Sequence, residues 1–259
     1  MLSIIIPTLN EEKYLPILLK EIQKQNFSDG FEIIVADAGS QDRTIEIARA
    51  FGCKIAPGGL PAKGRNDGAK AAEGDTLLFM DADDIYLPTN FLKQLLEEFE
   101  KRNLDVASFP ICPQGNGFDR IAYGNYNLWA RISQNFLPHA TNSILVKKEN
   151  FEKIGGFDEE IKMAEDHEFV RRAAKFGKFG FIKTEPVLTS TRRFERDGRL
   201  KTYLKYLIAG LHMFFLGKIK SDIYNYQFNQ YSQTELPKEA KVKKRTKSSS
   251  PTELLTEAG

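Results

Sequence analysis

Up to Asp81, short apolar segments alternate along the chain with segments that have the hydrophobic period of a helix. The apolar segments are SIIIP, FEIIVAD, KIAP and TLLFMD, each of a length that suits a buried strand. Helical patterns cover about residues 11–25, follow Asp42 and follow KIAP. In the first of these, one face carries Leu15, Leu18, Leu19 and Ile22. This alternation predicts βαβ units on a mostly parallel sheet.

The second half of the chain has a less regular pattern. A helix is expected from about Pro88 to Lys101, followed by a strand DVASFP, a mixed region to Pro138 and a strand ATNSILVKK. A Gly155–Gly156 turn then leads to a helix that opens near Ala164. The pattern predicts an α/β protein whose second half alternates less regularly between strands and helices than the first.

Composition narrows the class of protein only slightly. The 259 residues are 41% hydrophobic and 28% charged, which suits one large globular domain or a domain with an appendage. A net charge of +2 argues neither for nor against nucleic acid, because such binding usually needs a basic face or domain, and no nucleic-acid partner is expected. Cys53 and Cys112 have no metal-binding spacing and are interpreted as reduced thiols. The start, MLSIIIPTLNEE, lacks the basic region of a signal peptide, and a cytoplasmic protein is therefore expected.

Three polar clusters follow predicted strands, at residues 7–12, 37–42 and 81–84. In open α/β sheets ligands bind at the carboxyl ends of the strands, so these clusters are expected to converge. If the strand before Asp81 stays extended, Asp81 and Asp83 point to one side and Asp84 points away. Paired carboxylates suit Mg²⁺ or Mn²⁺ bound to a phosphate ester. The alternative is a helix cap or an Asx turn, which suits Asp84 better than Asp81.

Five motifs together resemble family 2 glycosyltransferases of the GT-A fold. They are SIIIPTLNEE, IIVADAGSQDRT, AKGRNDGAKAAEGDTLLFMDADD, IGGFDEEIKMAEDHEF and TSTRRFERDG, and the resemblance extends from Leu2 to Gly198. It implies a Rossmann-like, mostly parallel sheet flanked by helices, here with a C-terminal helical extension. It also implies transfer of a sugar from a nucleotide diphosphate donor such as a UDP- or GDP-sugar, usually with inversion, assisted by Mn²⁺ or Mg²⁺ at a DxD motif.

The resemblance assigns roles to residues around the donor. Pro7, Leu9 and Glu11 would lie beside the base and ribose, and Asp37 would read the base. The family often has a second acid at the position of Ala38. Arg65 would bind phosphate or sugar hydroxyls, although an exposed helical arginine is the alternative. Asp81 would contact ribose or the metal, and Asp83 would be the direct metal ligand between both phosphates.

The same resemblance makes Asp166 the catalytic base. It would lie in the first turn of a helix, where the dipole favours the ionised form. Without the resemblance, Asp166 and the acids around it would be interpreted as the acidic residues that are common in the first turn of a helix. Arg192 and Arg193 would stabilise the departing diphosphate. The QxxRW pattern of processive synthases is absent, which favours single or limited sugar additions, and His167 could approach the metal or the acceptor or be an ordinary histidine.

Three segments are expected: a catalytic GT-A domain over 1–198, an amphipathic helical segment over 199–234 and a disordered tail over 235–259. The stretch 200–228 is basic and aromatic, and its apolar core is too short to span a bilayer. It would either contact a membrane interface at the cytoplasmic face, which suits a lipid-linked acceptor, or pack on the core or in a dimer. The oligomeric state is left open.

Two other functions belong to different classes. A GT-A-like sugar nucleotidyltransferase would need a glycine-rich phosphate loop after the first strand, and PTLNEE has no glycine. A non-catalytic protein that binds nucleotide sugars would not need intact acids at positions 81, 83 and 166.

Overall fold

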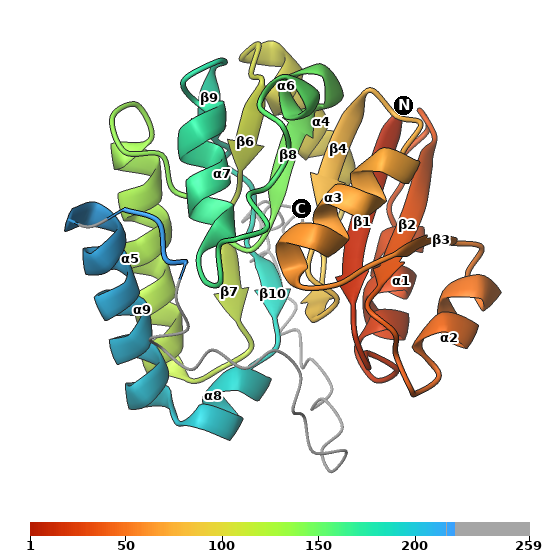
Figure 1. Cartoon of the computed structure of the whole chain (residues 1–259), viewed down its shortest axis with the longest axis horizontal. Coiled ribbons are helices and arrows are strands. Elements are labelled where there is room, and N and C mark those ends of the chain that lie inside the picture. The colour runs from red at the N-terminus through yellow and green to blue at the C-terminus, as the bar shows by residue number, and fades with distance from the viewer. Residues whose placement is uncertain (216, 221–259) are drawn as a thin grey trace, which may run out of the picture.

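The computed structural model describes residues 1–215 and 217–220, and Figure 1 shows their arrangement. The predicted tail 235–259 and residues 221–234 of the predicted helical segment lie outside the described residues. The first half contains β1 (Leu2–Thr8), α1 (Leu15–Gln23), β2 (Phe31–Asp37), α2 (Thr44–Ala50), β3 (Lys54–Pro57), α3 (Pro61–Ala71), β4 (Thr76–Phe79), β5 (Asp84–Tyr86) and α4 (Phe91–Lys101). The second half contains β6 (Val106–Ser108), β7 (Ile111–Pro113), α5 (Gly117–Ser133), β8 (Ile144–Lys147), α6 (Lys148–Lys153), α7 (Glu165–Ala173), β9 (Phe179–Phe181), β10 (Val187–Thr189), α8 (Arg192–Asp197) and α9 (Arg199–Phe215).

The main sheet has seven strands in the order β3-β2-β1-β4-β8-β6-β9. The pairs among β3, β2, β1 and β4 are parallel, as is the pair of β6 with β9. Only β8 runs in the opposite direction, and it pairs with β4 and β6. The α/β architecture with a mostly parallel sheet is therefore confirmed.

Alternate residues of the central strands pack on opposite faces of this sheet. Ile4 and Ile6 of β1 join a core with α1, α2 and α4, whereas Ile5 joins a second core with α3, α6 and α7. Neighbouring strands alternate in the same way, with Val35 in the first core and Ile34 in the second. Burial on both faces explains why these strands are continuous apolar runs in the sequence.

A second sheet of three strands, in the order β5-β10-β7, lies beyond the end of β4. Strand β10 is antiparallel to β5, with Thr189 opposite Asp84, and parallel to β7. The amide of Ser190 donates a hydrogen bond to the carbonyl of Asp83. This pairing carries the chain after β10, including α8, back to the aspartate cluster.

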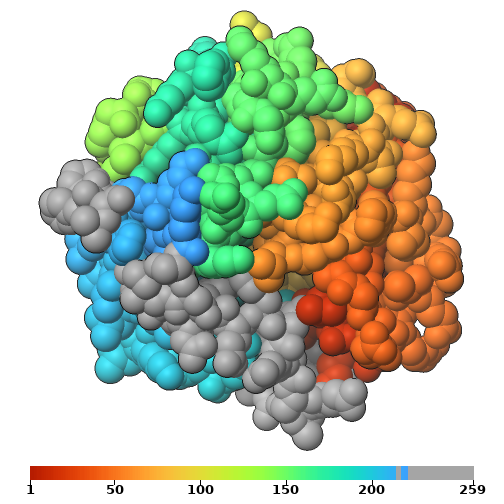
Figure 2. Space-filling view, in the orientation of Figure 1, coloured from red at the N-terminus to blue at the C-terminus, as the bar shows by residue number. Residues whose placement is uncertain are grey.

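The segment after α9, residues 217–220, contacts the body of the domain. Lys218 Nζ lies 2.7 Å from Asp158 Oδ2, and Met163 forms an isolated β-bridge with Ile219. Figure 2 shows this contact as bright blue atoms against the green atoms that precede α7. Among the described residues, no helix is both long and apolar enough to cross a membrane.

Several predicted boundaries differ from the structure. The first helix begins at Leu15, because residues 11–14 form a turn in which Tyr14 N donates to Glu11 O. The predicted strand DVASFP is shortened to β6, and β7, which follows directly after Pro110, belongs to the other sheet. The region up to Pro138, left without an assigned element, contains the long helix α5, which opens with a capping box between Asn116 and Asp119.

Glu32 should contribute to stability in a pH-dependent way. Its carboxylate accepts hydrogen bonds from Ser3 Oγ (2.6 Å) and Glu73 N (2.6 Å), and Lys54 Nζ lies at 2.7 Å. Burial raises its pKa, but these partners outweigh burial and lower the pKa to about 2. The stabilisation is therefore present above the unfolded pKa and is lost as the pH falls towards 2. It amounts to at most about 3 kcal/mol.

We expect Glu32→Gln to lower the free energy of unfolding at neutral pH, and its difference from the wild type to shrink at about pH 3. Urea denaturation at both pH values measures this. Glu97→Gln is the control, because the Glu97 side chain is 65% exposed and 3.8 Å from Lys93, so little change is expected. A difference for Glu32→Gln that is the same at both pH values would contradict the assignment.

Candidate active site

Arg65 lies at the centre of the candidate site. Helix α3 approaches β1 closely because Gly68 faces Ile5, where a Cβ atom would overlap the isoleucine side chain. Arg65 is only 3% exposed. It donates from Nη1 to Glu165 Oε1 (2.5 Å) and from Nη2 to Asp81 Oδ1 (2.8 Å). It is thus a buried bridge between three distant segments, and the alternative of an exposed helical arginine is wrong.

The aspartates after β4 do not continue the strand. Strand β4 ends at Phe79, and Asp84 N donates to Asp81 O (3.1 Å), which closes a turn. The extended geometry expected for Asp81 and Asp83 is therefore wrong. Asp83 Oδ2 instead accepts from Ser190 Oγ (2.7 Å) and lies 3.1 Å from Arg192 Nε. Asp81 faces α3 and Asp83 faces the chain after β10.

Arg192 connects Asp83 to the end of β1. Its guanidinium donates to both carboxylate oxygens of Glu11, at 2.6 and 2.8 Å, and lies over the ring of Tyr14, 4.8 Å from the centroid. The bidentate geometry is that of a strong charge-assisted pair. Arg193 points elsewhere and donates to Tyr206 OH (2.9 Å). The structure thus brings Arg192 into the acidic cluster and directs Arg193 towards α9.

Carboxylates outnumber their arginine partners in this cluster. Two guanidinium groups, Arg65 and Arg192, pair with four carboxylates, those of Glu11, Asp81, Asp83 and Glu165. Burial raises the pKa of Glu11 to about 7, although Arg192 lowers it. Burial likewise raises the pKa of Asp81 to about 6, with Arg65 opposing and Asp83 adding to the rise.

The four carboxylates and two guanidinium groups would carry two more negative than positive charges when fully ionised. Burial is the main cause of the raised pKa values, and the neighbouring carboxylates add to it. A divalent cation with oxygen ligands would neutralise the excess negative charge, and Asp81 and Asp83 supply oxygens that Mn²⁺ or Mg²⁺ accepts. The described residues contain no cluster of three or more His, Cys, Asp or Glu side chains arranged around one metal position. The fit therefore requires further ligands from a substrate or from water.

Asp84 has a different role from its neighbours. It is fully buried and accepts from Asn142 Nδ2 (3.1 Å) and Ser143 Oγ (3.3 Å). Burial raises its pKa well above the ordinary value, and Asp81 and Asp83 add to the rise. It starts β5 and does not cap α4, so the proposed capping role is wrong. Its contacts attach the turn to the residues just before β8, an arrangement that sequence spacing alone could not show.

Asp166 lies in the first turn of α7, as expected. The residue before the helix, Ala164, has a left-handed backbone (φ 62°), which is strained for a residue with a side chain. Burial raises the pKa of Asp166, but the charge and hydrogen bonds of His167 and the charge of Arg65 outweigh it and lower the pKa. Asp166 is therefore ionised at neutral pH. Its neighbour Glu165 could be interpreted from the sequence as an ordinary acidic residue of a first helical turn. In the structure it binds Arg65.

His167 begins a row of aromatic and histidine side chains that leads away from Asp166. Its ring lies 5.5 Å from that of His139, centroid to centroid, and Nε2 is 3.4 Å from Tyr126 OH. Trp129 Nε1 donates to His139 Nε2 (3.2 Å). Burial, together with His167, lowers the pKa of His139 to about 4, so the ring is neutral and can accept this bond. Only His167 of this row was singled out in the sequence, because the others lie on α5 and the loop after it.

Asp37 organises the loop after β2. It accepts from the amides of Gly39 (2.9 Å) and Ser40 (2.8 Å) and from the hydroxyls of Thr8 (2.9 Å) and Ser40 (2.5 Å). These bonds join the carboxyl ends of β1 and β2. Pro7 lies in β1 opposite Ala36, and Leu9 follows the strand. Pro7, Leu9 and Asp37 thus occupy the strand edge that also carries Glu11.

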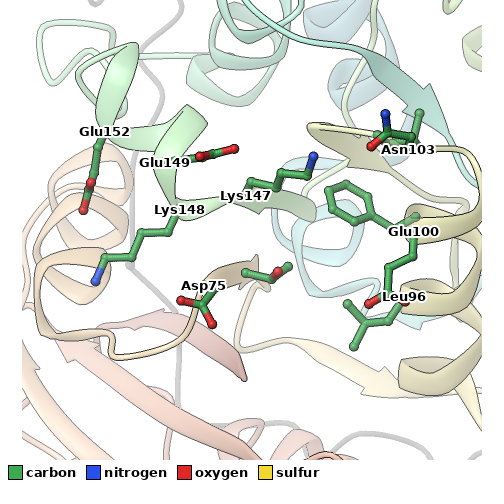
Figure 3. Close-up of a pocket in the computed structure, with 11 residues that line it drawn as sticks. Asp75, Leu96, Glu100, Asn103, Lys147, Lys148, Glu149 and Glu152 are labelled. Carbon is green, nitrogen blue, oxygen red and sulfur yellow. The ribbon is translucent and has the colours of Figure 1, made fainter.

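A separate pocket of about 710 Å³ lies at the other end of β4 (Figure 3). It is lined by Asp75, Thr76, Lys147 and Lys148 and by residues from the end of α4. Thr76 begins β4, whereas Asp81 follows its end, so this pocket is distinct from the acidic cluster. Lys147 and Lys148 are held by Asp105 and by the carbonyl of Ala72.

In open α/β sheets the loops at the carboxyl ends of the strands form the ligand-binding site, and here those loops carry the acidic cluster. The family described as "Glycosyl transferase family 2" matches residues 3–164, and "Glycosyltransferase like family 2" matches residues 117–234. The chain belongs to glycosyl transferase family 2, whose members move a sugar from a nucleotide sugar. The resemblance carried by the five motifs is confirmed.

Relatives differ in how much of their length this chain spans. An uncharacterized glycosyltransferase of Haemophilus influenzae is 30% identical over 209 residues, 73% of this chain and 67% of that protein. The poly(ribitol-phosphate) beta-N-acetylglucosaminyltransferase TarS of Staphylococcus aureus is 32% identical over 187 residues. That match covers 66% of this chain and 32% of TarS, so the chain spans about a third of the curated enzyme.

Solved structures show the same fold. TarS residues 1–349 in complex with UDP-GlcNAc has a TM-score of 0.60 and 25% identity, covering 74% of this chain and 58% of that one. The mannosyltransferase PcManGT of Pyrobaculum calidifontis, in complex with GDP-Man and Mn²⁺, has a TM-score of 0.57 and 19% identity, covering 80% and 64%. The GT-A fold expected from the sequence is therefore confirmed.

Arg65→Lys should destabilise the protein although it keeps the charge. One ammonium group cannot reproduce the two-armed bridge to Asp81 and Glu165, and a poorly paired buried charge can cost about 3 kcal/mol. We expect a lower midpoint of urea denaturation. Arg43→Lys is the matched control. Arg43 likewise donates two hydrogen bonds to carboxylate oxygens, here both of Glu46, but it does so on the exposed surface. Equal effects of the two substitutions would mean that burial of the Arg65 bridge contributes nothing.

Proposed function

We propose that the protein is an inverting, metal-dependent glycosyltransferase in which Asp166 is the general base. The observation that supports this is the acidic cluster of Glu11, Asp81, Asp83 and Glu165. It carries more negative charge than Arg65 and Arg192 neutralise. The charge of Arg65 also helps to lower the pKa of Asp166. One region would thus combine a place for a divalent cation with an ionised base.

The donor would be a UDP- or GDP-sugar. TarS is solved with UDP-GlcNAc and PcManGT with GDP-Man, and both share this fold. In this chain, Pro7, Leu9 and Glu11 at the end of β1 would lie beside the base and ribose. Asp37 would face the base while its hydrogen bonds keep the loop after β2 in place. The absence of a second acid at Ala38 leaves the choice of base to other residues.

Asp81 and Asp83 would hold Mn²⁺ or Mg²⁺, which supplies charge neutralisation for the diphosphate when bound. Asp83 would be the direct ligand, and Asp81, held by Arg65, would contact the metal or the ribose. Arg192 spans Glu11 and Asp83, and its guanidinium would therefore bind the diphosphate there. Arg193 is bonded to Tyr206 of α9, but its charge lowers the pKa of Asp81 and would add positive charge to the same region.

Asp166 would take the proton from the acceptor hydroxyl. As that oxygen forms a bond to the anomeric carbon, the bond from this carbon to the diphosphate oxygen breaks, and its electron pair leaves with the nucleoside diphosphate. The single displacement inverts the anomeric centre. The lowered pKa keeps Asp166 ionised and ready to accept the proton. A phosphate acceptor would react in the same way through its oxygen.

The acceptor would approach along the row from His167 to Trp129. Trp129 is 47% exposed, and aromatic rings of this kind offer a flat apolar face to a sugar ring. Transfer would be limited to one or a few sugars, because the chain lacks the QxxRW motif of processive synthases. A lipid-linked acceptor is in keeping with the basic and aromatic composition of residues 200–228.

A thermal-shift screen against UDP-, GDP-, dTDP- and CDP-sugars, each with and without Mn²⁺, tests the donor. Ligands that bind only the folded state raise the melting temperature. We expect one nucleotide class to stabilise the protein, and only with metal present. Stabilisation by the nucleotide without any effect of Mn²⁺ would overturn the metal assignment.

Substitutions should separate metal binding from catalysis. Asp83→Asn should abolish the metal-dependent thermal shift. Asp166→Asn should keep that shift while lowering the rate of transfer about 10²- to 10⁴-fold, the usual contribution of a general base. Donor hydrolysis in the presence of metal gives a rate that needs no known acceptor.

Glu168→Gln is the matched control for Asp166. It lies in the same helix turn, is paired with Arg172 and Lys218, and is placed outside the site. We expect its hydrolysis rate to equal that of the wild type. Loss of the donor-induced shift in both Asp83→Asn and Asp166→Asn would refute the division of roles between them.

A further inference from the structure

Helix α9 carries its bulky apolar residues on its outer face. Leu200 is 84% exposed, and Leu204, Leu207, Ile208 and Leu211 are between 42% and 60% exposed. The face that contacts the protein carries Thr202, Ala209 and Met213, so most of the bulky aliphatic side chains of α9 lie on the exposed face. A helix that only covers a protein core has its main apolar face turned inwards. A contiguous apolar surface of this kind marks an interaction site.

Helix α5 presents a second apolar stripe. Phe118, Ile121, Leu128, Trp129 and Ile132 recur at helical spacing, and each is between 47% and 67% exposed. They share one face because their positions fall within one sector of a 3.6-residue period. Together with α9, this helix holds most of the exposed large hydrophobic side chains among the described residues.

The two helices are joined at their N-terminal ends. Arg199 Nε and Tyr203 OH, both of α9, donate to the carboxylate of Asp119 in α5, at 3.1 and 3.0 Å. The ring of Phe118 packs edge-on against that of Tyr203, with centroids 5.5 Å apart. Figure 1 shows both helices at the left end of the molecule. Phe118 of the α5 stripe therefore contacts α9, and we call the two stripes together the α5–α9 surface.

The exposed charges within α5 and α9 have one sign, although Asp197 of the neighbouring α8 is close enough for Lys205 to lower its pKa. Arg120, Arg131 and Lys201 are exposed beside the stripes, and Lys205 is half-buried. Within Gly117–Ser133 and Arg199–Phe215 the one acid is Asp119, which is fully buried and bonded. Residues 238–247, KEAKVKKRTK, add a basic run to the same end of the chain. The surface thus combines apolar side chains with positive charge and no exposed carboxylate.

We propose that the α5–α9 surface docks on an anionic lipid bilayer, with its leucine and aromatic side chains in the interface. Amphipathic helices with basic residues beside an apolar face bind membranes in this way. Basic side chains are attracted to the negative surface of such a bilayer. A second copy fits less well, because a twofold dimer would set the same positive surface against itself.

Docking would also determine the side from which the acceptor reaches Asp166, an inference that rests on the proposed function. Trp129 belongs to the α5 stripe and hydrogen-bonds His139, whose ring contacts His167 next to Asp166. A bilayer at this surface would lie at the outer end of the row that leads to the base. A lipid-linked hydroxyl or phosphate would then reach Asp166 from the membrane side.

Co-sedimentation of the full chain with vesicles tests docking without any nucleotide. We expect binding to vesicles of equal parts phosphatidylcholine and phosphatidylglycerol, and much weaker binding to phosphatidylcholine alone. Raising the salt concentration from about 0.1 M to about 1 M should reduce binding, because the screening length falls from about 10 Å to about 3 Å. A wild-type chain that stays in the supernatant with both kinds of vesicle would overturn the proposal.

Two pairs of variants locate the contact. Leu204→Glu with Leu207→Glu should lower the bound fraction at least about tenfold, whereas Phe176→Glu, at a similarly exposed ring outside the surface, should leave it unchanged. Lys201→Gln with Lys205→Gln should weaken binding to anionic vesicles, whereas Lys93→Gln with Lys101→Gln on α4 should not. Melting temperature and the donor-induced thermal shift report that each variant is folded.

A second copy of the chain on the α5–α9 surface would give a different result. If the α5–α9 surface were a dimer interface, sedimentation velocity without vesicles would show a dimer that Leu204→Glu with Leu207→Glu converts to a monomer. That outcome, or unchanged vesicle binding by the double glutamate variant, would refute membrane docking. Neither outcome affects the proposed chemistry, because donor binding and hydrolysis are measured without lipid.

Discussion

The two-armed bridge from Arg65 to Asp81 and Glu165 is the interaction on which the site depends. It joins α3, the turn after β4 and the start of α7, which are far apart in the sequence. A buried guanidinium needs more than one carboxylate partner, and these carboxylates in turn need the guanidinium to remain ionised. The position of the neighbouring Asp166 follows, because the helix that carries Glu165 cannot move without breaking the bridge.

A second bridge, from Arg192 to Glu11 and Asp83, closes the other side of the same cluster. It brings α8 to the main sheet through the small sheet β5-β10-β7, whose pairing sets Ser190 against Asp83. The two arginines therefore hold the cluster together while leaving it short of positive charge. That shortage links the packing of the fold to the proposed binding of a divalent cation and a diphosphate.

The sequence predicts the first half of the fold well because burial on both faces of β1, β2 and β4 leaves continuous apolar runs. It predicts the second half less well. Strands β6 and β7 have three residues each and are separated by a change of sheet, which no periodicity reveals. The role of Asp84 depends on tertiary hydrogen bonds to Asn142 and Ser143, which the sequence does not reveal. The sequence likewise shows Glu165 only as an acidic residue in a first helical turn, because its partner Arg65 lies 100 residues away.

The apolar pattern of α9 illustrates the limit of such predictions. A helical period in the sequence shows that one face is apolar, but not whether that face turns inwards or outwards. In α1 the leucine face is buried against the sheet, whereas in α9 the leucine face is exposed and Thr202, Ala209 and Met213 turn inwards. The difference arises because the inward face of α9 is held by several contacts. Asp119, fully buried in α5, accepts bonds from Arg199 and Tyr203. Arg193 donates to Tyr206, and Ala209 and Met213 pack with Met163 and Ile219. These contacts together fix the rotation of α9 and leave its leucine face exposed.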